Sequence, residues 1–407
     1  MKLPYSILLI SLLLLAFAGY SQTAKEFYDR GLPKLELKDD QSAIQDFNKA
    51  IELEPKYAEA YLARGRAKFD LQDNKGGFTD FATALEINPN FAEAYFCRGS
   101  VRLNFQDING AITDLTKAIE FNPKYAVAYL GRGTARLALN DSQGASADFT
   151  MAIEINPKYA EAYFLRGFVK FGLYEDQGAI PDITKAIELN PKFAEAYALR
   201  GTLKVNLHDY VGAISDFTQA IGINPNYSDA YKTRGVAKMS MQDNIGAIED
   251  LTTAIEMNPK DADAYYQRGG AKKHLNDFTG AIADFSISIE IDPGNVLAFF
   301  CRANVKLGLS DYVGAIDDYN KSIGFDSTRT EAYLGRGNAK RLLYDYPGSI
   351  ADFTKAIEIA PENAEAFHNR GLSKIESGEK EGGCQDLNKA RELGFAKADE
   401  TIRKYCQ

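Results

Sequence analysis

The stretch AEAYLARGRAKF, residues 58–69, decides how the rest of the chain is understood. Its RGRAKF end (64–69) returns 34 residues later as RGSVRL (98–103), and the same step then gives RGTARL (132–137), RGFVKF (166–171) and RGTLKV (200–205). Residues 24–397 hold eleven such copies of 34 residues without an insertion. A fixed period of this length indicates an array of stacked structural units.

Each copy predicts two helices joined by a turn. Counting Ala24 as position 1, helix A begins at position 1 and carries an aromatic residue at position 4, such as Tyr61. An Asp at position 16 and a Gly at position 19 predict the turn. Helix B follows, with apolar residues at helical spacing, and Pro at position 32 ends it.

At Tyr61, Gly65, Phe81 and Pro89 the chain resembles the tetratricopeptide repeat (TPR) family. The resemblance covers the eleven repeats in residues 24–397 and implies an all-α fold, a right-handed α-solenoid (superhelix) of antiparallel helix pairs with a concave groove. Residues 398–407 begin like another helix A and predict a C-terminal capping helix.

Two charged positions are filled in the same way in all eleven copies, Arg at position 7 and Asp at position 23. We expect a structural charge ladder in which each Arg meets the Asp of its own repeat, because a buried charge needs a partner. A row of arginines that binds phosphates or carboxylates is the less favoured alternative. The pairs singled out are Arg64 with Asp80, Arg98 with Asp114, Arg132 with Asp148, and Arg166 with Asp182.

The residues that vary between copies are the better candidates for a partner site. The resemblance implies that helix A lines the groove at positions 2, 5, 9, 12 and 13, which gives repeats two to five an apolar stripe. The alternative is that these side chains pack on neighbouring helices. The predicted partner-binding residues are Leu62, Arg66, Phe69, Phe96, Leu103, Leu130, Leu137, Phe164 and Phe171.

The N-terminus of the chain suggests an exported protein. Residues 1–18 read as a signal peptide, with cleavage after residue 18 or 21, so we expect a periplasmic or secreted protein without a membrane span. Four cysteines are few for an exported chain. Cys384 and Cys406 form a candidate pair, but four free thiols are the favoured expectation.

The net charge and the absence of catalytic motifs favour a binding function over catalysis. The net charge of −9 argues against non-specific nucleic-acid binding. His208, His274 and His368 occupy three different repeat positions, and no catalytic or cofactor motif is present, so we expect no enzyme, no metal site and no cofactor. The sequence predicts a protein–protein interaction scaffold that holds an extended peptide or a helix. The alternative is a binding module for envelope glycan or cell-wall polymer.

Overall fold

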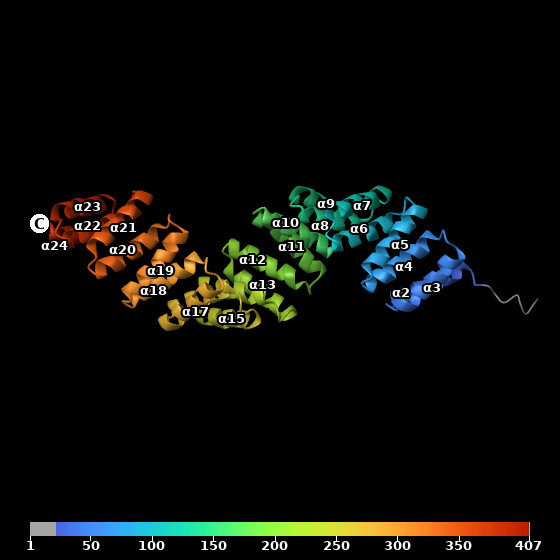
Figure 1. The fold of residues 1–407 in the computed structure, drawn as a ribbon, viewed down its shortest axis with the longest axis horizontal. Coiled ribbons are helices and arrows are strands. Elements are labelled where there is room, and N and C mark those ends of the chain that lie inside the picture. The colour runs from blue at the N-terminus through green and yellow to red at the C-terminus, as the bar shows by residue number, and fades with distance from the viewer. Residues whose placement is uncertain (1–21, 407) are drawn as a thin grey trace, which may run out of the picture. The chain divides into compact units, whose positions relative to one another are not determined.

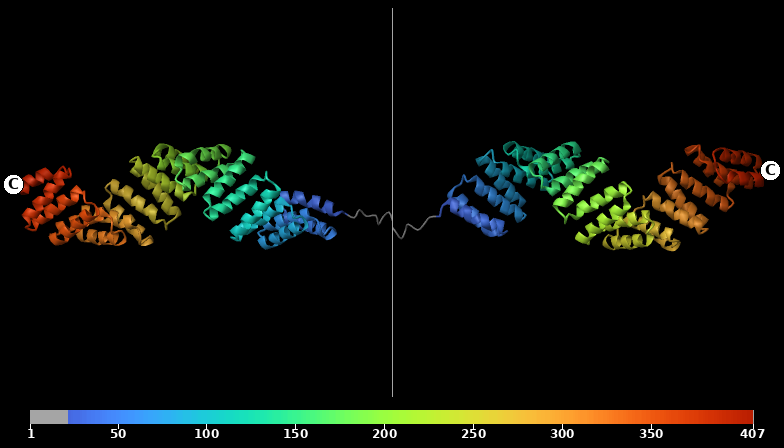
Figure 2. Two further views of the ribbon diagram at one scale, coloured as in Figure 1. Left: turned by 90° about the horizontal axis from the view of Figure 1, so that it is seen from above. Right: turned by 180° about the vertical axis from the view of Figure 1, so that it is seen from behind.

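The computed structural model describes residues 22–406, and these residues form helices with no β-strand among them (Figure 1). The all-α fold of paired helices predicted from the repeats is confirmed. The chain divides into two compact units, the first ending at Lys192 and the second beginning at Phe193. Within each unit, every helix A packs on helix B of its own repeat, and helix B packs on the next helix A (Figure 2).

The first unit holds five repeats. Its A helices are α2 (Ala24–Glu36), α4 (Ala58–Asp70), α6 (Ala92–Asn104), α8 (Ala126–Ala138) and α10 (Ala160–Gly172). Its B helices are α3 (Asp40–Leu53), α5 (Asn74–Ile87), α7 (Ile108–Phe121), α9 (Ser142–Ile155) and α11 (Asp176–Leu189).

The second unit holds six repeats and a final helix, α24 (Ala398–Tyr405). Its A helices are α12 (Ala194–Asn206), α14 (Ser228–Ser240), α16 (Ala262–His274), α18 (Val296–Gly308), α20 (Thr330–Leu342) and α22 (Ala364–Glu376). Its B helices are α13 (Tyr210–Ile223), α15 (Asn244–Met257), α17 (Phe278–Ile291), α19 (Tyr312–Phe325), α21 (Tyr346–Ile359) and α23 (Lys380–Glu392).

A close approach between a glycine and a ring holds the two helices of a repeat together. A Cβ atom on Gly65 would lie 2.6 Å from the ring of Phe81, and one on Gly133 would lie 2.6 Å from the ring of Phe149. Both rings are buried completely or almost so. The glycine at position 8 therefore lets helix A lie directly on the large side chain at position 24, where a larger residue would push the helices apart.

The turn between the helices is built from backbone hydrogen bonds. In repeat two, Gln72 adopts a left-handed conformation (φ 65°) and donates its N–H to the carbonyl of Phe69, while Asp73 donates to the carbonyl of Lys68. This is the hydrogen-bond pattern of a Schellman C-cap. The carboxylate of Asp73 then accepts a hydrogen bond of 2.8 Å from the N–H of Gly76 and caps helix B.

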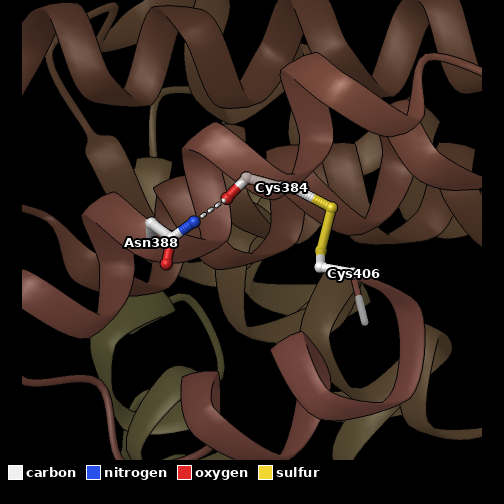
Figure 3. The surroundings of a disulfide bond; sticks show 3 residues. All are labelled: Cys384, Asn388 and Cys406. Carbon is white, nitrogen blue, oxygen red and sulfur yellow. Dashed lines mark hydrogen bonds between the residues drawn. A yellow bond between two sulfur atoms is a disulfide. The ribbon is translucent and has the colours of Figure 1, made fainter.

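The C-terminal end corrects one expectation from the sequence. Cys384 and Cys406 form a disulfide (Figure 3), so the prediction of four free thiols is wrong for this pair. Cys97 and Cys301 are free. Helix α24 packs on α23 and brings the two Cα atoms to 5.8 Å, within the usual disulfide range. His368 also contacts α24, with 3.0 Å between its Nε2 and the hydroxyl of Thr401.

The predicted signal peptide at residues 1–18 and both predicted cleavage sites lie outside the described residues. Among the residues that are described, none of the helices combines the length and the hydropathy that crossing a membrane requires.

Candidate functional site

The repeated charges form three-membered clusters between helix A and helix B. In repeat two, Arg64 donates two hydrogen bonds to Asp80, 2.9 Å from Nε and 2.6 Å from Nη2, and the ammonium of Lys68 lies 2.8 Å from the same carboxylate. Only 2% of Asp80 is exposed. Two parallel bonds from a guanidinium and one from an ammonium satisfy a carboxylate that would otherwise be costly to bury.

The other three predicted pairs have the same arrangement. The distance from Arg Nη2 to Asp Oδ1 is 2.7 Å for Arg98 and Asp114, 2.7 Å for Arg132 and Asp148, and 2.6 Å for Arg166 and Asp182. Burial alone would raise the pKa of Asp182, but the hydrogen bonds from Arg166 and Lys170 outweigh it and lower the pKa. The carboxylate therefore stays charged within its pair.

Most of the ladder arginines also join their repeat to the one before it. Nη1 of Arg132 donates to the hydroxyl of Thr116, and Nη1 of Arg166 donates to that of Thr150, both at 3.2 Å. The guanidinium carbon of Arg64 lies 5.3 Å from the centre of the Tyr61 ring, at cation–π distance. Because the hydrogen-bond donors and one face of these guanidinium groups are occupied by the protein, they offer little to a ligand. The ladder instead fixes the register of helix A on helix B.

Leu62 corrects the predicted groove. Only 5% of it is exposed, and it packs in the core cluster that contains Phe81 and Leu85. Helix A turns position 5 toward the residue at position 34 of the same repeat, which in this repeat is Phe91. Leu62 is therefore a packing residue and is not available to a partner.

The same contact between positions 5 and 34 involves Phe96. Its ring lies 5.3 Å from the ring of Tyr125, centre to centre, and both residues pack on the core. Leu130 is likewise half-buried against two core clusters, and Phe164 stacks on Phe168 with 6.5 Å between ring centres. Phe96 and Leu130 therefore serve mainly to hold neighbouring helices together, whereas Phe164 stacks on a residue of its own helix α10.

At position 12, the four predicted residues are half-buried. Phe69 packs beside the cluster of Phe81, Leu103 beside that of Leu115, and Leu137 beside that of Phe149. Phe171 is half-buried at the same position of repeat five. Each keeps part of its surface open, so position 12 remains a candidate for contact with a partner.

Three of the predicted residues meet in one pocket. Arg66 and Phe69 from α4 and Phe96 from α6 line a cavity of about 220 Å³, together with Phe81. Lys38, Asp70, Cys97 and Ser100 complete the lining. The phenyl rings make an apolar floor, and charged side chains stand at the rim.

The rim charges occur in pairs. A guanidinium nitrogen of Arg66 lies 3.0 Å from a carboxylate oxygen of Glu93. The ammonium of Lys38 lies 2.6 Å from a carboxylate oxygen of Asp70. Burial raises the pKa of the Cys97 thiol to about 12, so the thiol stays protonated at neutral pH and acts as part of the apolar wall. The pocket can hold an uncharged side chain while the rim offers hydrogen-bond donors and acceptors.

Comparison with known proteins agrees with this geometry. Family models described as tetratricopeptide repeat match residues 233–296 and, separately, residues 27–57 and 194–227. The matched segments fall in both units, and every 34-residue copy is a helix pair. The chain thus contains tetratricopeptide repeats in both units.

Several solved structures are similar to this chain. YrrB, described as a TPR protein with an unusual peptide-binding site, is 25% identical, covers 45% of this chain and 95% of its own, and has a TM-score of 0.41. Yeast Tom70 is 17% identical, covers 93% of each chain and has a TM-score of 0.38.

The APC/C hetero-tetramer Cut9–Hcn1 is 12% identical, covers 97% of this chain and 98% of its own, and has a TM-score of 0.50. This likeness shows the fold alone. No curated protein matches the sequence significantly.

Sequence reasoning missed part of the pocket in this TPR protein. Ser100 and Asp70 occupy repeat positions 9 and 13, which the family resemblance assigns to the groove. Their repeat positions alone could therefore have identified them as pocket residues. Lys38 lies at position 15, where the backbone is in the left-handed conformation, and Cys97 lies at position 6. Neither is repeated with the same chemistry in neighbouring copies, so the sequence held no signal that would place them here.

Proposed function

We propose that this TPR protein is a non-catalytic protein-interaction scaffold that binds an extended peptide or a helix of a partner on the helix-A side of repeats two and three. The observation that supports this is the pocket lined by Arg66, Phe69 and Phe96. An apolar floor below a polar rim suits the insertion of one aliphatic or aromatic side chain.

The rim suits the rest of a peptide. The side chains of Arg66 and Glu93 are about half exposed, and Lys38 is more exposed than its partner Asp70. Exposed ion pairs of this kind contribute little to stability, so exchanging one for a hydrogen bond to a peptide backbone costs little. The pocket therefore favours a neutral anchor residue with its flanking main chain.

The aromatic rings that recur at positions 4 and 34 are poorly placed to bind a glycan or cell-wall polymer. Sugar binding by stacking needs exposed aromatic faces, whereas the rings of Tyr61, Tyr95 and Tyr129 at position 4 lie beneath guanidinium groups of the ladder. Rings at position 34, such as Tyr125, pack on the preceding helix A. We therefore favour a protein or peptide partner over a polymer.

We also propose that the protein is exported to a periplasmic or extracellular location. The signal-like residues 1–18 and the Cys384–Cys406 disulfide support this, because disulfides persist in oxidising compartments. The mass of the protein purified from cells tests it. Loss of the first 18 or 21 residues agrees with export, and an intact N-terminus in the cytosolic fraction contradicts it.

The pocket itself can be tested with a matched pair of variants. Peptides selected from a random phage-displayed library on the wild-type protein are titrated against Phe69→Ser and Phe171→Ser, which make the same change at the same repeat position. We expect shared aromatic or aliphatic anchors and a loss of about tenfold in affinity only for Phe69→Ser. Equal affinities for both variants would contradict the proposed site.

A further inference from the structure

The two units differ at the residues that open helix B, positions 17 and 18 of each repeat. In repeats one to five these residues are DQ (40–41), NK (74–75), IN (108–109), SQ (142–143) and DQ (176–177). In repeats six to ten they are YV (210–211), NI (244–245), FT (278–279), YV (312–313) and YP (346–347). Apart from Ile108, the openings of the first unit are polar, whereas every opening of repeats six to ten carries at least one apolar or aromatic residue.

The apolar side chains of the second unit are exposed. Val211 is 66% exposed, Ile245 65% and Val313 63%. Across each A–B turn they accompany the residue at position 14, which is 38–49% exposed in these repeats: Leu207, Met241, Leu275, Leu309 and Leu343. We call this row of residues at positions 14, 17 and 18 of repeats six to ten the turn edge.

Helix formation does not explain the choice at position 18. β-Branched residues such as Val and Ile have a lower helix propensity than Gln or Lys, and repeats one, two and four form helix B with Gln41, Lys75 and Gln143 in this place. The side chains of Val211 and Ile245 also gain little from burial in the folded chain. Exposed apolar side chains at the same place in successive repeats are therefore candidates for a binding surface.

A pocket opens beside the turn edge. Phe278 and Lys273 line a cavity of about 240 Å³ with Asn304, Val305 and Gly308 of the next repeat. A hollow near the A–B turns of repeats four and five in the first unit is lined mainly by polar residues, among them Asn140, Asp141 and Glu175. The second unit thus offers a place where an apolar side chain can be anchored.

The charge of the turn edge selects among partners. Every A–B turn in it carries an exposed aspartate that caps helix B: Asp209, Asp243, Asp277, Asp311 and Asp345. The lysines at position 11 nearby are already paired at 2.8 Å with the buried aspartates at position 23, as in Lys238 with Asp250. The edge is therefore apolar and acidic, with Lys273 at the pocket and His208 beside one turn.

We propose that the turn edge of repeats six to ten is a second docking surface, which binds an amphipathic protein segment carrying apolar and basic side chains. A second copy of this chain would bring another row of aspartates against the first, and an anionic bilayer would bring phosphates. Both are repelled by the charge that attracts lysine or arginine. The surface lies in the second unit and does not depend on the pocket lined by Phe69.

A designed peptide provides the test. A fluorescent amphipathic helix of about 14 residues, four turns, carries leucines on one face and lysines on the other, and a second version has glutamates in place of the lysines. We expect the lysine peptide to bind the full chain with an affinity that falls as salt rises, and the glutamate peptide to bind at least about tenfold more weakly. Equal binding of both peptides would overturn the proposal.

Three variants locate the binding. Val211→Gln, Ile245→Gln and Val313→Gln combined should weaken the lysine peptide about tenfold, while Leu71→Gln, Leu139→Gln and Leu173→Gln combined remove three exposed apolar residues of the first unit and should leave the affinity unchanged. The combination Asp209→Asn, Asp243→Asn and Asp277→Asn keeps the helix caps but removes charge, and should reduce both affinity and salt dependence. Thermal unfolding checks that each variant is folded.

Two other outcomes would also overturn the proposal. One is self-association in sedimentation experiments that the turn-edge glutamines abolish, which would assign the surface to a second copy. The other is binding to phosphatidylglycerol vesicles that the same glutamines abolish, which would assign it to a membrane.

Discussion

Repeat three (α6 and α7) and repeat seven (α14 and α15) share the same helix pair and charge ladder. They differ in the contact between the residues at positions 5 and 34. In both, the ladder pair is the same: Nη2 lies 2.7 Å from Oδ1 in Arg98–Asp114 and in Arg234–Asp250. At positions 5 and 34, repeat three has two packed rings, those of Phe96 and Tyr125. Repeat seven has an ion pair there, with 2.9 Å between Lys232 and Asp261.

The comparison separates what the array requires from what it tolerates. The ladder sets the register of helix A on helix B and keeps its chemistry in every repeat. The contact between positions 5 and 34 needs two matched partners, but the match can be aromatic or ionic. In repeat nine it is a cation–π contact, with the Arg329 guanidinium 5.3 Å from the centre of the Phe300 ring.

Breaking the shared ladder should have the largest effect. Asp250→Leu leaves Arg234 and Lys238 without their carboxylate, and we expect it to lower the free energy of unfolding by about 3–5 kcal/mol. Glu249→Leu, at the neighbouring exposed position, is the control and should change little. Urea unfolding followed by circular dichroism measures both variants. Equal stability of the two would show that the ladder does not set the register.

Exchanging the variable contact should have a smaller effect. Lys232→Phe leaves the carboxylate of Asp261, which is mostly buried, against a ring, and should cost about 1–3 kcal/mol. The double variant Lys232→Phe with Asp261→Tyr recreates the pair of repeat three and should recover part of that loss. Recovery will be incomplete, because Asp261 also caps α16 through the N–H of Ala264. Additive effects in the double-mutant cycle would contradict the idea of a matched pair.

The contacts between positions 5 and 34 in repeats three and seven should also differ in their dependence on pH. Burial alone would raise the pKa of Asp261, but the hydrogen bond and charge of Lys232, together with backbone hydrogen bonds from Ala264 and Asp263, outweigh burial and lower the pKa. The stabilisation is therefore fully present above the pKa of an unfolded Asp, about 4, and is lost as the pH falls through the lower folded value. The coupling energy between Lys232 and Asp261 should decrease in acid.

The coupling energy between Phe96 and Tyr125 should stay constant over the same range, since burial raises the pKa of Tyr125 and keeps its hydroxyl neutral. Double-mutant cycles measured at pH 7 and in acid test this difference. A parallel decrease for both pairs would indicate a general loss of structure and would contradict the assignment to Asp261.

The smallest predicted effect concerns the link between repeats two and three. Ala82 occupies the place where other repeats have a side-chain oxygen that accepts a hydrogen bond from the next arginine, as Thr116 does for Arg132. Ala82→Thr should supply such an acceptor for Arg98 and raise the unfolding free energy by about 1 kcal/mol. Ala82→Val has a similar shape without the oxygen and is the control. A gain of the same size in both variants would assign the effect to packing.

The repeats made much of the fold predictable from the sequence. Eleven copies act as an internal comparison, so the helix pairs and the pairing of Arg64 with Asp80 follow from positions that never change. The disulfide between Cys384 and Cys406 did not follow, since it depends on how the unique helix α24 packs back on α23.

The candidate site was less predictable, for a physical reason. Leu62 was assigned to the groove by its repeat position, but that position packs on position 34. Lys is found at position 15 only as Lys38, and Cys at position 6 returns only in repeat nine, as Cys301, so no periodic signal marks these two pocket residues. Residues that are the same in every copy build the scaffold. The residues suited to contact a partner are those that vary between copies, so the repeat pattern does not predict them.

Site-specific photo-cross-linking tests the central claim most directly. A photo-reactive amino acid replaces Arg66 at the rim of the pocket or, as the control, Thr134, which is exposed at the same position of repeat four. In cells that produce the protein, we predict that Arg66 yields one defined cross-linked protein through a segment with an apolar anchor, and that Thr134 does not. Cross-linking of equal yield and identity at both positions would contradict a partner site in repeats two and three.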